Sequence, residues 1–200
     1  MDTKDYIYLD HSATTPVDPK VLEAMQSVLL KNYGNPSSMH QLGQEGAKLI
    51  DDSRSQIAQV LSSARSEIVF TSGGTESDNS AIKGASFALK EQGNHIITTS
   101  IEHHAVLHTC EWLEKFGGFE VTYLNPDNEG FIRPEQVIDA ITDQTTVVSI
   151  MYVNNEVGVI EPIAAIAKAL KDYQEKHDRN IVFHTDAVQA PGWLSLDVDE

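Results

Sequence analysis

One segment of the sequence has the residue types of a phosphate-binding turn. It reads TSGGTES, residues 71–77, and is expected to join an apolar strand to a helix. Glycine lets the backbone approach an anion closely, and the first turn of a helix offers free N–H groups with a partial positive charge. The same residues also suit a tight turn that Ser72 or Thr75 caps. The pattern is neither a Walker loop nor a dinucleotide-binding fingerprint.

A second segment, EHHAVLHTC at residues 102–110, holds three histidines and the one cysteine of the chain. A flat imidazole there can stack on an aromatic ligand. His103 and His104 are adjacent and point in different directions, so one can face a ligand while the other faces solvent or a neighbour. His104 and His108 are four residues apart and could share a helix face as metal ligands. Because no third ligand stands at an obvious spacing, we assign no metal site.

Two more polar segments follow apolar runs. Asp186 ends the run at residues 181–185, where an acid can bind a cation or a protonated ring nitrogen, or can cap the next turn. Asn154 and Asn155 follow the run at residues 146–153. Two successive amides favour hydrogen bonds to a ligand, or a turn with Asn in the left-handed region.

Apolar, β-branched runs predict short buried strands that alternate with longer segments of helical spacing. The strands are expected at residues 68–71, 95–99, 120–124, 146–153 and 181–185, and the helices at 21–30, 43–61, 76–92, 105–116, 134–141 and 163–177. This alternation predicts an α/β fold, a mainly parallel sheet with helices on both faces. Ligands bind beyond the carboxyl ends of parallel strands, so the polar segments are expected to meet there.

Composition limits the classes of function. The chain has 200 residues, of which 40% are hydrophobic, and 14 Lys and Arg against 30 Asp and Glu give a net charge of −16. Such an acidic surface repels phosphate backbones and anionic lipids, so neither a nucleic-acid partner nor a membrane partner is expected. The single cysteine, Cys110, excludes an internal disulfide and favours a reducing, cytoplasmic setting.

Six segments in order resemble the cysteine desulfurases of the NifS/IscS type. These class V aminotransferase family members are pyridoxal-phosphate (PLP) enzymes of the aspartate-aminotransferase fold, PLP fold type I. The segments are residues 8–16, 34–38, 69–77, 102–106, 154–158 and 186–189. Any one of them is a weak match, whereas six in the right order are specific. Residues 106–110, VLHTC, resemble the housekeeping iron–sulfur branch rather than the branch that includes selenocysteine lyases.

The resemblance implies PLP as the cofactor and assigns its phosphate and ring contacts. Gly74 and Thr75 would hold the phosphate. His103 would stack on the pyridine ring and act as the catalytic residue that moves protons. Asp186 would pair with the pyridinium nitrogen and so keep the ring able to accept electrons.

The resemblance also implies the remaining contacts, the reaction and the partners. Asn155 and Gln189 would reach the phenolic oxygen of PLP. The family reaction takes sulfur from L-cysteine, leaving L-alanine and an enzyme persulfide for iron–sulfur cluster or thiocofactor synthesis. The expected partners are a second copy of the chain, in a homodimer, and a sulfur-acceptor or scaffold protein.

Two parts of that machinery are not found at the expected places. The Schiff-base lysine should follow Asp186 by roughly two dozen residues. Only 14 residues follow Asp186, and none is Lys. Cys110 falls at a helical position, whereas the family nucleophile lies on a loop far downstream.

We therefore interpret the chain as the N-terminal part of a longer enzyme, inactive alone. It would consist of an N-terminal arm, residues 1–15, and a partial PLP-binding large domain, residues 16–200. Three alternatives stay open: a selenocysteine lyase, another class V PLP enzyme, or a non-catalytic fragment that acts as a folded or dimerisation domain.

Overall fold

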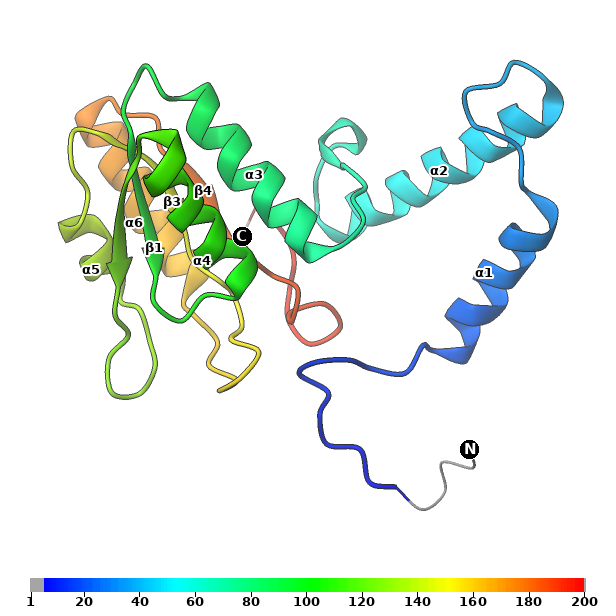
Figure 1. Ribbon diagram of the computed structural model, residues 1–200, viewed down its shortest axis with the longest axis horizontal. Helices are drawn as coiled ribbons and strands as arrows, with labels where there is room; N and C mark the ends of the chain where they lie inside the picture. Colours follow the sequence, from blue (N-terminus) through cyan, green and yellow to red (C-terminus); the bar gives the residue numbers. More distant parts are fainter. Residues whose placement is uncertain (1–5, 200) are drawn as a thin grey trace. The chain divides into compact units, whose positions relative to one another are not determined.

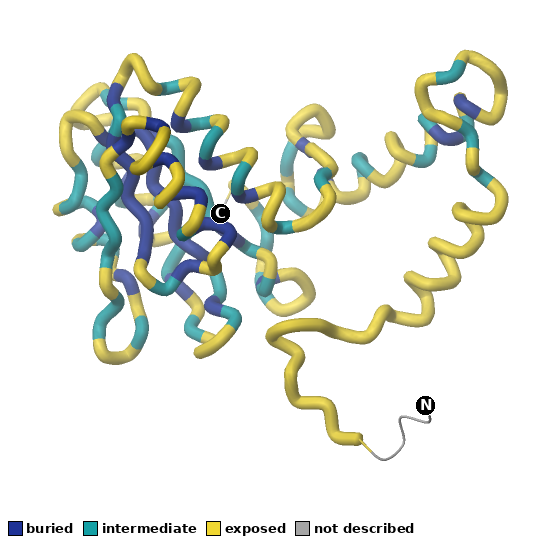
Figure 2. Tube along the Cα trace, viewed as in Figure 1, coloured by how far each residue is buried: buried dark blue, intermediate teal, exposed yellow. Residues whose placement is uncertain are grey.

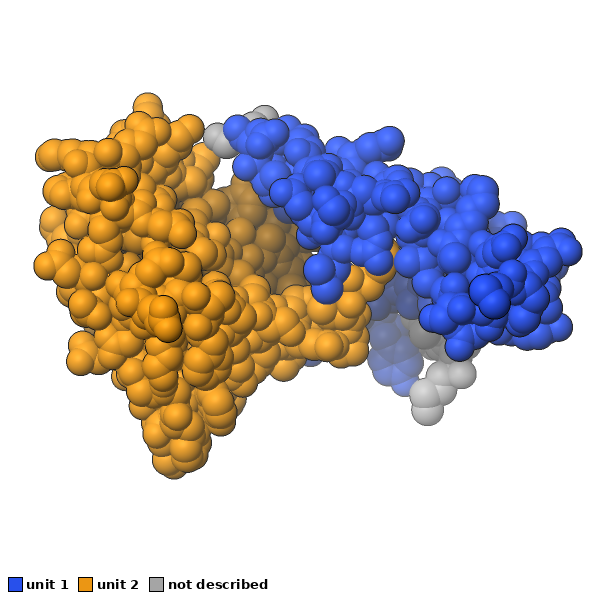
Figure 3. All heavy atoms as spheres, turned by 90° about the horizontal axis from the view of Figure 1, so that it is seen from above, with its two compact units in different colours: residues 1–69, 196–200 blue, residues 70–195 orange. Residues whose placement is uncertain are grey.

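The computed structural model describes residues 6–199. The chain divides into two compact units, a helical unit of Met1–Val69 with Leu196–Glu200 and a sheet unit of Phe70–Ser195 (Figure 3). The predicted division into an arm, residues 1–15, and a large domain stays a prediction, and its first five residues lie outside the described part. Among the described residues, no helix is both long and apolar enough to cross a membrane.

The sheet unit contains four parallel strands in the order β2-β1-β3-β4 (Figure 1). They are β1 His95–Thr99, β2 Glu120–Leu124, β3 Thr145–Ser149 and β4 Val182–His184. The expected parallel sheet is confirmed, although the last two strands are shorter than predicted. Beyond β3 the backbone still follows β4, because the Ile150 and Tyr152 N–H groups donate to the carbonyls of His184 and Asp186 at 3.0 and 2.8 Å.

Helices cover both faces of this sheet, as the sequence predicts. They are α3 Gly74–Ala88, α4 His104–Trp112, α5 Pro134–Asp139 and α6 Ile163–His177, with a π-helical turn η3 at Leu113–Gly117 after α4. Successive residues of β1 point to opposite faces. Ile96 packs with Ile82 of α3 and Val106 of α4, whereas Ile97 packs in the cluster of α5 and α6. The core therefore has two halves, one on each side of the sheet (Figure 2).

The strand predicted at residues 68–71 is wrong. Ile68 has an extended backbone, but the segment belongs to no strand and pairs with none among the described residues. Val69 and Phe70 are 78% and 47% exposed, so an apolar, β-branched composition alone does not make a buried strand. A strand also needs a neighbour to complete its backbone hydrogen bonds.

The helical unit contains α1 Pro19–Lys31, α2 Gln41–Val60 and a 3₁₀ turn η2 at Arg65–Glu67. Its close packing lies around the start of α2, where Gly43 and Gly46 are buried. A Cβ added to Gly34 would stand 2.2 Å from the Leu42 carbonyl oxygen, so this approach requires glycine. By contrast, α1 buries none of its residues.

Candidate active site

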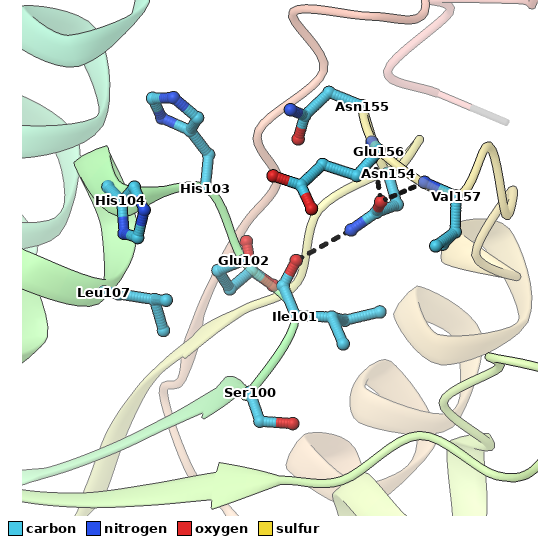
Figure 4. A pocket seen from close by; sticks show the side chains of 10 residues that line it. All are labelled: Ser100, Ile101, Glu102, His103, His104, Leu107, Asn154, Asn155, Glu156 and Val157. Carbon is cyan, nitrogen blue, oxygen red and sulfur yellow. Dashed lines mark hydrogen bonds between the residues drawn. The ribbon is translucent and has the colours of Figure 1, made fainter. Parts of the chain in front are cut away.

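The loops after β1 and β3 border a cavity of about 290 Å³ in the sheet unit (Figure 4). Its wall includes Glu102, His103 and Leu107 from the first loop and helix, and Asn155 and Glu156 from the second loop. Both loops follow strand ends, as predicted. Two of the six predicted site residues, His103 and Asn155, therefore line one cavity.

His103 has a structural role as well as an exposed ring. Its Nδ1 accepts a hydrogen bond of 3.1 Å from the Ala105 N–H and so caps the N-terminus of α4. Because Nδ1 accepts, the neutral ring carries its proton on Nε2. The cap fixes the ring orientation and leaves the Nε2–H group as the available donor.

The two adjacent asparagines differ in role. Asn154 is buried, donates from Nδ2 to the Ile101 carbonyl at 2.8 Å, and accepts from the Glu156 and Val157 N–H groups at 2.9 Å (Figure 4). It therefore holds the loop, but the left-handed Asn that the sequence left open is wrong, because among the non-glycine described residues only Ser62 and Asp178 have positive φ. Asn155 is only partly buried and lines the cavity.

Asn155 also borders a second cavity of about 290 Å³, lined in part by Gln189, Trp193 and Leu194. This cavity lies between the loop after β3 and the segment after β4. Asn155 thus forms part of the wall of both cavities, with His103 on one side and Gln189 on the other. Neither of these two cavities is lined by all six predicted site residues.

The N-terminus of α3 lies against the segment after β4. A Cβ added to Gly74 would be 2.9 Å from Cγ2 of Val188, so the close approach of these two segments favours glycine. Thr75, in the first turn, is exposed. Helix geometry leaves the first N–H groups of α3, those of Gly74 and Thr75, without intrahelical partners.

Glu76 would compete with a bound phosphate for one N–H group of the turn before α3. Its Oε2 accepts a hydrogen bond of 2.7 Å from the Ser72 N–H, and hydrogen bonding to Ser72 lowers the pKa of Glu76. One donor of the turn is therefore already used by the chain's own carboxylate. The sequence did not suggest this, although an acid in the first helical turn is a common N-terminal signal.

Asp186 is almost buried, with 8% of its surface exposed. Its Oδ1 accepts a hydrogen bond of 2.9 Å from the Val188 N–H, so it does stabilise the turn that follows β4. That turn also brings Val188 to Gly74. Asp186 consequently stands between the start of α3 and the end of β4, close to two further buried acids.

The first of these acids is Asp78 on α3, which is 4% exposed. Its Oδ1 lies 3.6 Å from Nε2 of His184, whose Nδ1 is 2.9 Å from the Ser149 hydroxyl. Burial, with a further contribution from Asp186, raises the pKa of Asp78 to about 7. Burial lowers the pKa of His184, which Asp186 partly opposes. Both shifts favour the uncharged forms of the two side chains.

The second is Glu102, at the end of the loop after β1. Burial raises its pKa to about 8, Asp186 and Asp78 add to this, and hydrogen bonds from Met151 and Thr99 oppose it. The sequence alone suggested no role for either acid. Helical spacing could have identified Asp78, because it shares the buried face of α3 with Ile82 and Ser86 at four-residue steps.

Of the remaining candidate residues, His104 also lines the first cavity. Cys110 is completely buried, and burial raises the pKa of its thiol to about 12. The rings of His104 and His108 stack at 5.0 Å on α4. Among residues 6–199, no group of three or more His, Cys, Asp or Glu side chains is arranged to hold a metal ion.

Comparison with known proteins assigns the family. The family model described as Aminotransferase class-V matches residues 7–200, and the chain therefore belongs to the class V aminotransferase family. It is 49% identical over 197 residues to the cysteine desulfurase IscS of Dictyoglomus turgidum, with 98% of this chain and 48% of that protein covered. It is 52% identical over 192 residues to the cysteine desulfurase IscS of Methanosarcina thermophila, with 96% and 46% covered. The chain thus spans about half the length of these curated relatives.

Solved structures agree with this assignment. A NifS-like protein superimposes with a TM-score of 0.90 at 37% identity, covering 97% of this chain and 52% of that one. SspA in complex with cysteine superimposes with a TM-score of 0.87 at 44% identity, covering 96% and 53%. The predicted fold class, part of the large domain of PLP fold type I, is confirmed.

Proposed function

We propose that the chain is the cofactor-binding half of a PLP-dependent cysteine desulfurase that converts L-cysteine to L-alanine and enzyme-bound persulfide sulfur. The observation that carries the proposal is the close approach of Gly74 to Val188. It sets the N–H groups at the start of α3, which suit a phosphate, beside the turn of Asp186, which suits a protonated ring nitrogen.

The donor set of the described residues fits PLP. The helix N-terminus and the Thr75 hydroxyl offer hydrogen-bond donors to a phosphate. Asp186 forms no ion pair with Lys or Arg among the described residues, so a cationic ring nitrogen would give its carboxylate a partner of opposite charge. The capped imidazole of His103 offers a flat surface and an Nε2–H donor.

When bound, PLP supplies an electron sink for a substrate carbanion. The residues of this chain bind and orient it in the proposal. Gly74 and Thr75 would hold the phosphate, and Asp186 would accept a hydrogen bond from the protonated ring nitrogen. His103 stacks on the ring and moves protons, while Asn155 and Gln189 reach the phenolic oxygen.

We extend the proposal to partners and setting. The exposed apolar residues of α1 support a homodimer, because such a face is usually covered by a partner. A sulfur-acceptor or scaffold protein would receive the sulfur for iron–sulfur cluster or thiocofactor synthesis. The net charge of −16 argues against nucleic acid or an anionic membrane as a partner, and the single cysteine supports a reducing, cytoplasmic setting.

The phosphate assignment is tested by titrating PLP into the 200-residue chain. Thr75→Val should weaken binding by about 0.5–1.5 kcal/mol, because it removes one hydrogen bond to the phosphate. Ser80→Ala, at an exposed position further along α3, is the matched control and should leave affinity unchanged. Equal affinities for the wild type and Thr75→Val would contradict the assignment.

We further expect that these 200 residues, produced alone, release no sulfide from L-cysteine. Cys110 is the one cysteine of the sequence and is buried, and no Lys follows Asp186. Covalent catalysis of this class requires both an amine and a thiolate. Sulfide release that is proportional to the chain and is lost in Asp186→Ala would refute this expectation.

A further inference from the structure

The carboxyl group of Glu102 is held in an asymmetric environment. Its Oε1 accepts two hydrogen bonds, from the Thr99 hydroxyl and from the Met151 N–H, both of 2.9 Å. Its Oε2 is buried and has no hydrogen-bond partner. The residue as a whole is 5% exposed. A buried anionic oxygen without a donor is strongly disfavoured, whereas a buried O–H group at the same position is far less so.

The groups around Glu102 make its ionised form still less favourable. Asp186 and Asp78 both interact with it electrostatically, and it in turn acts on the thiol of Cys110 in α4. None of the described residues forms an ion pair with Glu102. The titratable groups that face this region are Asp78, His103, Cys110, Glu156, His184 and Asp186.

The three buried acids come from three different elements. Asp78 lies on α3, Glu102 follows β1, and Asp186 follows β4. Asp78 lies 3.6 Å from a base, His184. Among the described residues no His, Lys or Arg lies within ion-pair distance of Glu102, and its Oε2 has no hydrogen-bond partner. Asp186, which would face the cationic ring nitrogen in the proposed function, has the Val188 N–H at Oδ1.

We propose that Glu102 is a positioning residue that retains its proton on Oε2 at neutral pH, so that the negative charge of the three-acid cluster is concentrated on Asp186. This inference rests on the proposed function, in which Asp186 binds the ring nitrogen of PLP. Glu102 then acts through Asp186 and need not touch the cofactor. Its two hydrogen bonds also join the end of β1 to the backbone after β3, one residue before His103 in the chain.

The proton on Glu102 is tested without any cofactor. The carboxyl ¹³C resonances of the labelled 200-residue chain are followed against pH, and the Glu102 signal is assigned by its absence in Glu102→Gln. The expected midpoint is about 8, against an ordinary value of 4.5. A midpoint between about 4 and 5 would overturn the proposal.

The coupling to Asp186 has a separate test in the same experiment. Asp186→Asn removes the neighbouring anion, so the Glu102 midpoint should move to lower pH. Asp139→Asn, at an exposed acid on α5, is the matched control and should not move it. An unchanged Glu102 midpoint in Asp186→Asn would contradict the coupling.

A third measurement links Glu102 to the cofactor. Glutamine is neutral and of the same shape, so Glu102→Gln should bind PLP at pH 7 within about twofold of the wild type. A loss of about tenfold or more would mean that a charged Glu102 contributes to binding, which overturns the proposal. If the wild type binds no PLP, the proposed function fails, while the ¹³C titration still decides where the proton lies.

Discussion

Two amphipathic helices of similar length, α1 and α6, differ in whether their apolar residues are buried. In the sheet unit, α6 buries Ile166 and Leu170 against the sheet. In the helical unit, α1 buries no residue, and Leu29 and Leu30 are 73% and 69% exposed (Figure 2). Both helices begin and end as their sequences indicate. Local signals are therefore sufficient to form a helix, whereas burial depends on what the rest of the chain or a partner supplies.

The difference extends to the units as wholes. The sheet unit has two buried clusters, one on each face of its sheet, and so carries its own core. The helical unit buries little beyond the glycines at the start of α2, Ala58 and Ile68. Each unit should consequently respond differently to substitution, to pH and to dilution.

The largest expected effect is on the core of the sheet unit. Ile97 is completely buried, so Ile97→Ala should lower the free energy of unfolding by about 2–5 kcal/mol. Leu29→Ala on α1 should change it by less than about 0.5 kcal/mol. Urea unfolding is followed by circular dichroism and by the fluorescence of Trp112 and Trp193, which both lie in the sheet unit. Equal losses of unfolding free energy in Ile97→Ala and Leu29→Ala would contradict the claim that only the sheet unit carries its own core.

The next effect is a pH dependence confined to the sheet unit. The pKa of Asp78 is about 7 in the folded chain and 3.8 without the fold. Asp78 therefore binds its proton more tightly in the folded chain than in the unfolded chain. Protonated Asp78 contributes to the free energy of unfolding below pH 4, and this contribution is lost as pH rises through 7. We expect this loss to be about 2–4 kcal/mol and to be absent in Asp78→Asn.

Other groups act in the opposite direction over the same range. His184, with a lowered pKa, favours the folded state more as pH rises through its unfolded value. The test is therefore the difference between the unfolding free energies of the wild type and Asp78→Asn at pH 4 and pH 8. A difference that does not change with pH would show that Asp78 is ordinarily ionised.

A smaller effect should appear in self-association through α1. Leu22 and Leu29 are 57% and 73% exposed on this helix. Replacing both by Lys should raise the dissociation constant of the proposed homodimer by about tenfold or more, because it places charge where apolar contact is needed. Gln26→Lys on the same helix adds charge without removing an apolar side chain. Light scattering against concentration measures the effect, and a monomeric wild type would contradict this use of α1.

Most of the fold could be predicted from the sequence. Apolar, β-branched runs and period-3.6 patterns give the four strands and six helices correctly to within a few residues, and Pro134 does begin α5. The failure at residues 68–71 has a physical origin. Composition reports that a segment is suited to a strand, but pairing depends on a neighbour that no local pattern specifies.

The candidate site was predictable in part. Strand ends pointed to the pair His103 and His104, the pair Asn154 and Asn155, and Asp186, and the family resemblance then selected His103 and Asn155 from the two pairs. Local patterns could not show that Asn154 would be used to hold its own loop, or that Glu76 would occupy the Ser72 N–H. The acid cluster of Asp78 and Glu102 depends on burial from three elements at once, and that is a property of packing rather than of spacing.

The most direct test of the central claim is a crystal structure of this chain grown with PLP. The account predicts the phosphate within hydrogen-bond distance of the Gly74 and Thr75 N–H groups, with the ring beside His103 and its nitrogen facing Asp186. A phosphate ordered only at another place, or a ring nitrogen turned away from Asp186, would contradict the account.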